Sequence, residues 1–174
     1  MNPDIKPGSF FEPEEDPYQS QDRREQPEQS RAFGPEVSDR LQDQLETFKT
    51  ALNPDAEVIY YPCCQNDTTI SQVFPNSRTI YADLNSAAIT MLKEHKFEAV
   101  EADATTYEPD QQPNIVLLLN PAINPEKPAS TVKEGGYLIC NNYHNTANNL
   151  HSDENFEFIG AIVPKRDGQT ILDT

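Results

Sequence analysis

Acidic and amide side chains follow several short apolar runs in this sequence, where a folded chain would present them at the ends of strands. Asp83 ends the run RTIYAD, Asp103 ends FEAVEAD, and Asn120 ends NIVLLLN. Carboxylates accept hydrogen bonds from hydroxyl and amino groups, and an amide holds a polar ligand without adding charge. The spacing therefore indicates a polar binding site assembled from separate strands.

The stretch EVIYYPCCQNDTT ends the first apolar run in Pro62 and two adjacent cysteines, Cys63 and Cys64. A zinc site needs about four ligands in spacings such as C-x-x-C, which these two and the distant Cys140 do not supply, so no metal is expected. A nucleophilic thiol needs a nearby base, whereas a buried free thiol is usually inert. Two interpretations remain, and in both of them Asp67 or Thr68 caps the next helix. The loop either faces a ligand, with a carboxylate or phosphate bound by the N–H groups of that helix start, or is a merely structural turn.

A second polar cluster, NNYHN, occupies residues 141–145. A histidine side chain suits removal of a proton from an amine or hydroxyl near neutral pH, which makes His144 a candidate catalytic residue. Amide-rich turns also form because Asn bonds its own backbone and tolerates positive φ. Both interpretations stay open for this cluster.

Regular alternation of helices and strands would position these residues, and the sequence shows it from Ser38 onward. Apolar residues recur at helical spacing up to Leu52, with Ser38 as a candidate N-cap. Asn85 is the candidate N-cap of the helix expected at 86–96. Strands are then expected at 58–61, 78–84, 97–103, 114–120 and 137–143, separated by helices at 68–74, 86–96, 125–132 and about 146–154.

The run at 114–120 is apolar on both faces, which is typical of a central strand in a parallel sheet covered by helices on either side. The final runs, 156–163 and 169–172, are joined by PKRDG and predict an antiparallel return. We therefore expect an α/β fold: a three-layer Rossmann-like sheet, mostly parallel, with a terminal antiparallel β-hairpin.

Ligands of such sheets bind outside the carboxyl ends of the strands, so Asp83, Asp103 and Asn120 should lie along one edge. An acid after the second strand is placed to accept hydrogen bonds from two ribose hydroxyls. The alternative is that Asp83 only favours the dipole of the helix that follows it.

The layout resembles that of class I S-adenosylmethionine-dependent methyltransferases over roughly residues 38–174. The resemblance implies that the loop after the first strand, with Pro62, Cys63 and Asp67, approaches the amino-acid part of S-adenosylmethionine. It also implies that Asp83 holds the ribose and that Asp103, followed by Ala104, reaches the adenine.

Residues 120–123 resemble the Asn-Pro-Pro-aromatic motif of methyltransferases that act on amino groups. The resemblance implies that the Asn120 side chain and the Pro121 carbonyl hold the amine. The chain departs from the family in two places. Ala122 and Ile123 replace the second proline and the aromatic residue, and the first loop lacks the family's glycines, which let the backbone pass close to a ligand.

Acidic residues outnumber basic ones 29 to 13, for a net charge of −16. Such a surface repels phosphate backbones, so nucleic acid is a disfavoured partner. No apolar run approaches the roughly 20 residues of a membrane-spanning helix. The three cysteines fit a reducing compartment, and we expect a cytoplasmic protein without membrane contact.

Residues 1–36 are rich in proline and acidic residues and poor in aliphatic ones, which predicts a disordered tail before a domain at 37–174. The tail's aromatic residues, such as Phe10 and Phe33, offer anchors for a protein partner. Two functions are therefore open: a methyltransferase-like protein that binds S-adenosylmethionine and acts on an unknown acceptor, or a non-catalytic protein of the same fold that contacts a partner through its tail.

Overall fold

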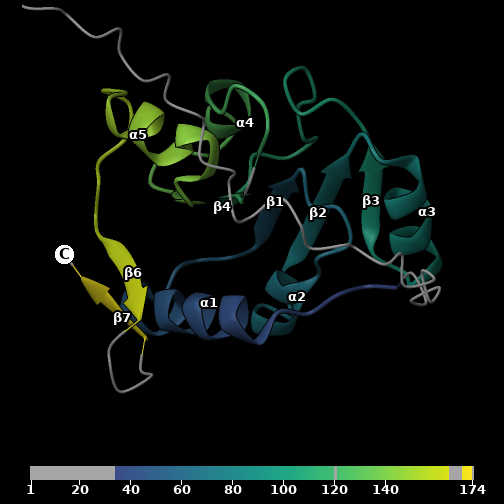
Figure 1. The fold of residues 1–174 in the computed structure, drawn as a ribbon, viewed down its shortest axis with the longest axis horizontal. Coiled ribbons are helices and arrows are strands. Elements are labelled where there is room, and N and C mark those ends of the chain that lie inside the picture. Colours follow the sequence, from purple (N-terminus) through teal and green to yellow (C-terminus); the bar gives the residue numbers. More distant parts are fainter. Residues whose placement is uncertain (1–33, 120, 165–169, 174) are drawn as a thin grey trace, which may run out of the picture. The chain divides into compact units, whose positions relative to one another are not determined.

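The computed structural model describes residues 34–119, 121–164 and 170–173 (Figure 1). Five strands form one sheet in the order β3-β2-β1-β4-β5, and all neighbouring pairs in it are parallel. This confirms the predicted α/β class and the parallel sheet. The strands are β1 (Val58–Pro62), β2 (Arg78–Asp83), β3 (Glu98–Glu101), β4 (Ile115–Leu118) and β5 (Tyr137–Cys140).

Helices cover both faces of this sheet, so the predicted three layers are present (Figure 1). Alternate residues of β1 show the division: Ile59 packs with α1, α2 and α3, whereas Val58 packs with α4 and α5. The helices are α1 (Asp39–Leu52), α2 (Thr69–Val73), α3 (Ser86–Glu94), α4 (Glu126–Ala129) and α5 (Thr146–His151), and the short 3-10 helix η1 (Tyr143–Asn145) precedes α5.

Local hydrogen bonds explain where the longer helices begin and end. The Ser38 hydroxyl accepts the N–H of Leu41 at the start of α1, and Asn53 ends that helix in a left-handed conformation with φ of 42°. The Asn85 side chain accepts the N–H groups of Ala87 and Ala88 at the start of α3. These caps leave orphan N–H groups satisfied, as the sequence predicted for both helices.

The register of the strands brings their carboxyl ends to one level. Pro62 pairs with Ala82, and Asp83 pairs with Glu101. The N–H of Cys63 donates to the Ala82 carbonyl at 2.7 Å, which continues the pairing one residue beyond β1. The strand order reverses between the neighbouring strands β1 and β4, so the ligand-binding crevice of such a fold is expected beside the end of β1.

The terminal hairpin consists of β6 (Ala161–Pro164) and β7 (Thr170–Asp173), which pair antiparallel as predicted. It forms a two-stranded sheet of its own that lies against α1, without joining the five-stranded sheet. The predicted start at residue 156 is wrong. Phe158 and Ile159 are 64% and 44% exposed, so these two side chains do not pack in the core, and the strand begins only at Ala161.

Most of the predicted tail, residues 1–33, lies outside the described ranges. The residues just before α1 contact the loop after β1: the N–H of Glu36 donates to the Asn66 carbonyl at 2.8 Å, and the Asn66 amide donates to the Gly34 carbonyl at 3.0 Å. Residues 34–36 therefore pack with the domain. In the described part of the chain, no helix is long and apolar enough to cross a membrane.

Candidate functional site

The ends of three strands bring together Cys63, Asp83 and Asp103, which are far apart in the sequence. Burial raises the pKa of the Cys63 thiol to about 11, and the carboxylates of Asp83 and Asp103 add to this shift because both lie near it. The thiol is therefore protonated at neutral pH, which removes the nucleophilic form. Asp83 and Asp103 thus lie near the end of β1, whereas Asn120, the third residue expected at this edge, is outside the described residues.

Asp83 is half-buried, and each of its carboxylate oxygens accepts one backbone hydrogen bond. Oδ2 accepts the N–H of Gln65 and Oδ1 accepts the N–H of Asn85, both at 2.8 Å. A carboxylate oxygen has two lone pairs, so each still has one acceptor position. None of the ion pairs among the described residues involves Asp83. The geometry therefore leaves a negative acceptor at the edge of the sheet.

Asp103 is exposed and lies shortly after the end of β3. Its Oδ1 accepts the Thr105 hydroxyl at 2.7 Å and the Thr105 N–H at 2.8 Å. These two bonds hold the pKa of Asp103 below its usual value, so the side chain is ionised at neutral pH. Ala104, which follows it, is buried.

The loop after β1 reaches this site with a backbone that normally favours glycine. Cys63 and Gln65 have φ angles of 56° and 50°, in the left-handed region. This conformation costs a residue with a Cβ about 1–2 kcal/mol. The loop therefore contains no glycine, although two of its residues adopt backbone angles that only glycine adopts without strain.

We expect Gln65→Gly to raise the free energy of unfolding by about 0.5–1 kcal/mol, because relief of the left-handed strain exceeds the greater entropy of glycine in the unfolded chain. The Gln65 side chain is exposed, and its N–H bond to Asp83 stays available. Urea denaturation would measure the change. Gln111→Gly is the matched control, because Gln111 is exposed without a positive φ, and it should lower the stability.

The other predicted residues of this loop have structural contacts. Pro62 is buried at the end of β1. The Oδ2 of Asp67 accepts the Tyr61 hydroxyl at 2.9 Å, and its Oδ1 accepts the Thr69 N–H at the same distance. Asp67 thus binds the first N–H of α2, as both interpretations of this loop predicted. The expectation that the N–H groups at this helix start hold an anion stays a prediction.

The candidate catalytic residues lie farther along the chain. Asn120 is outside the described residues, and Pro121, which follows it, is buried. His144 is exposed with φ of 53°, and its ring lies edge-on to Tyr143 at 4.3 Å between centroids. No hydrogen bond or ring contact between described residues joins His144 to Asp83 or Asp103. Its role as a base therefore stays a prediction.

Tyr60 is a candidate site residue that the sequence did not reveal, because its place in a strand indicated packing alone. The side chain is fully buried, and its ring lies 5.9 Å from that of Tyr107 between centroids. Its hydroxyl has no hydrogen-bond partner among the described residues. A phenol on the inward face of a strand was the available signal, because a buried tyrosine hydroxyl usually finds a partner.

The remaining thiols do not form a reactive centre. Cys64 is buried and donates to the Ala82 carbonyl at 3.7 Å, and burial raises the pKa of both Cys64 and Cys140. In the described ranges, no three His, Cys, Asp or Glu side chains gather as a metal site requires.

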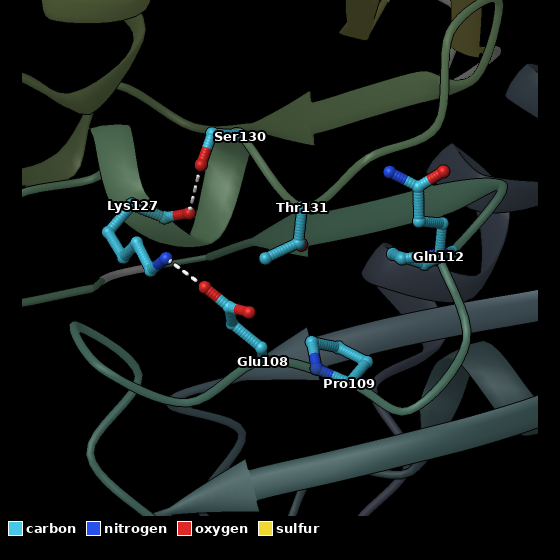
Figure 2. Close-up of a pocket in the computed structure, with 7 residues that line it drawn as sticks. Glu108, Pro109, Gln112, Lys127, Ser130 and Thr131 are labelled. Atoms are coloured by element: carbon cyan, nitrogen blue, oxygen red, sulfur yellow. Dashed lines mark hydrogen bonds and ion pairs between the residues drawn. The ribbon is translucent and has the colours of Figure 1, made fainter.

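A cavity lies apart from these residues, between α4 and the segment that precedes β4. Figure 2 shows the Glu108 side chain pointing toward Lys127 at this cavity, which Gln112 and Thr131 also line. The Lys127 ammonium forms an ion pair with Glu108, so the charges of the cavity wall neutralise one another. None of the residues predicted from the sequence as site residues lines this cavity.

No protein-family model and no curated protein sequence matches the chain. Similar solved structures include coclaurine N-methyltransferase, with 14% identity, a TM-score of 0.47 and coverage of 55% of this chain and 34% of that one. The N-methyltransferase NodS from Bradyrhizobium japonicum WM9 has 10% identity, a TM-score of 0.48 and coverage of 58% and 66%. A SAM-dependent methyltransferase from Geobacter sulfurreducens has 12% identity and a TM-score of 0.47, and the match covers 63% of this chain and 50% of that one. The chain thus spans about a third to two thirds of these proteins.

Proposed function

We propose that this chain binds S-adenosylmethionine at the carboxyl edge of its five-stranded sheet and transfers the methyl group to an acceptor. The observation that carries the proposal is the gathering of Cys63, Asp83 and Asp103 from three strand ends at the level where such folds bind ligands. The sequence resemblance supplies the identity of the ligand.

The chemistry of the edge fits this cofactor. Asp83 retains an acceptor position on each oxygen, which suits the two adjacent hydroxyls of a ribose. Asp103 is ionised, and it would accept from the amino group of adenine. The loop from Cys63 to Gln65 keeps a backbone typical of glycine and would pass close to the amino-acid part.

The charge of the edge favours this ligand over a dinucleotide. Asp83, Glu101 and Asp103 lie at the ends of two adjacent strands, and none of them takes part in an ion pair among the described residues. Unpaired carboxylates attract a sulfonium or ammonium and repel a pyrophosphate. A cationic adenosyl compound is therefore the better electrostatic match.

S-adenosylmethionine supplies a methyl group that is already activated as part of a sulfonium. The protein's task is to align the acceptor's lone pair with this methyl and to exclude competing water. Asn120 and Pro121 would hold the acceptor after β4, and His144 would take its proton. These roles rest on the sequence motif and on the expected position of strand ends.

Isothermal titration with S-adenosylmethionine and S-adenosylhomocysteine tests the proposal directly. We expect binding of one molecule per chain, and a thermal melt at about 100 times the dissociation constant should show roughly 2.7 kcal/mol of stabilisation. Incubation with radiolabelled S-adenosylmethionine and panels of amines then tests for methyl transfer. The absence of heat and of a thermal shift up to millimolar ligand would overturn the proposal.

A second candidate is a non-catalytic protein of this fold that acts through a protein partner. Two features of the loop after β1 favour this second candidate, because both narrow the space for a ligand. The loop has side chains in place of glycines, and the Gln65 N–H donates to the Asp83 carboxylate. The same titration separates the candidates, since this protein would give no signal with either adenosyl compound.

A further inference from the structure

The hydroxyl of Tyr60 is an unmatched polar group in the centre of the sheet. Tyr60 is 0% exposed, and its hydroxyl lacks a hydrogen-bond partner among the residues that the structure describes. Leaving such a group unpaired destabilises a folded protein, because the hydroxyl loses its bonds to water and gains none. A ligand that supplies a partner would remove this penalty.

The surroundings of Tyr60 connect it with the candidate site. Its ring lies 5.9 Å from Tyr107, which belongs to the segment that begins at Asp103. Burial raises the pKa of Tyr60 above its usual range, and nearby Tyr107, Cys63 and Asp103 add to the shift. The phenol is therefore close to residues that follow both β1 and β3.

Two neighbouring tyrosines show that this fold normally pairs such groups. The Tyr61 hydroxyl donates to Asp67 at 2.9 Å, and the Tyr81 hydroxyl lies 2.6 Å from the Ser71 hydroxyl. Both belong to the face covered by α1, α2 and α3, whereas Tyr60 lies on the opposite face. The unpaired state thus distinguishes Tyr60 from buried tyrosines of the same strands.

We propose that the Tyr60 hydroxyl donates a hydrogen bond to a ring nitrogen of the purine when an adenosyl ligand binds at the carboxyl edge. This inference rests on the proposed function and adds a binding residue to it. The purine is the expected contact because the Tyr60 ring lies beside Tyr107, whose N–H donates to the carbonyl of Asp103, the residue proposed to reach the adenine. Ring nitrogens of adenine accept a hydrogen bond, as a phenol donor requires.

Tyr60→Phe tests the proposal through two effects of opposite sign. Removal of an unpaired hydroxyl should raise the melting temperature of the ligand-free protein by about 3 °C. Loss of the donor should weaken binding of S-adenosylhomocysteine, and of adenosine alone, by about tenfold. A hydroxyl that served packing alone would give the first effect without the second.

Tyr81→Phe is the matched control, because Tyr81 is equally buried and its hydroxyl is paired with Ser71. It should lower the melting temperature and leave the affinity for both ligands unchanged. Measuring adenosine separately assigns the contact to the nucleoside. A weaker affinity for S-adenosylhomocysteine with no change for adenosine would overturn the assignment to the purine.

The remaining outcomes also decide the question. If the unaltered protein binds S-adenosylhomocysteine and Tyr60→Phe binds it equally well, the inference fails while the proposed function stands. If the unaltered protein binds neither ligand, both fail together. A lower melting temperature for ligand-free Tyr60→Phe would show that the hydroxyl already has a partner, such as a buried water, and would also overturn the inference.

Discussion

Asp83→Ala should lower the affinity for S-adenosylhomocysteine by about 100-fold or more. The carboxylate has one free acceptor position on each oxygen, and two charge-assisted hydrogen bonds to ribose hydroxyls would be lost with it. Isothermal titration measures the change. Asp83→Asn keeps one acceptor oxygen without the charge, so its affinity should fall between those of the unaltered protein and the alanine variant.

The same substitution also removes two local hydrogen bonds, which must be separated from the loss of binding. Asp83 accepts the N–H groups of Gln65 and Asn85, so Asp83→Ala should lower the free energy of unfolding by about 1 kcal/mol. Asp153 is a suitable control, because its carboxylate accepts the Asn155 N–H at 2.9 Å. Asp153→Ala should weaken the fold slightly and leave binding unchanged.

Unchanged affinity in a folded Asp83→Ala protein would exclude Asp83 as the ribose-binding residue. In that case, the alternative proposed from the sequence would account for the aspartate, because its Oδ1 already accepts the N–H of Asn85 at the start of α3. Circular dichroism and urea denaturation would establish that the variant retains the fold.

Leu117→Ala should lower the free energy of unfolding by about 3 kcal/mol. Leu117 is fully buried in β4, in the core beneath α1, α2 and α3. Truncation removes the transfer free energy of the lost carbon atoms and leaves a cavity. β4 is held between β1 and β5, so the backbone cannot move far to close this cavity. Urea denaturation followed by circular dichroism measures the difference.

Leu84→Ala makes the same chemical change at a position that is 67% exposed. It should alter the stability by less than about 0.5 kcal/mol. Similar losses for the two variants would contradict the central position of β4, because only burial distinguishes the two leucines in this comparison.

The sequence by itself determined the alternation of elements and several of their boundaries. The run around β4 is apolar on both faces because helices cover it on both sides, and that pattern is visible in the residue types alone. Ser38 and Asn85 mark helix starts because a cap acts on N–H groups two or three residues away. The placement of Asp83 and Asp103 along one edge followed from the rule that parallel strands end at the same edge of a sheet.

Tertiary structure alone decided features that depend on strand order, register and side-chain direction. The bond from the Gln65 N–H to Asp83 requires β1 beside β2 in a register that places Pro62 opposite Ala82. The hairpin lies against α1 as a separate sheet. The sequence of the two strands did not determine this, because strand pairing depends on which distant segments the fold brings together. Tyr60 and Tyr61 are adjacent and chemically identical, and only the partners that the fold brings to each face leave one hydroxyl paired and the other unpaired.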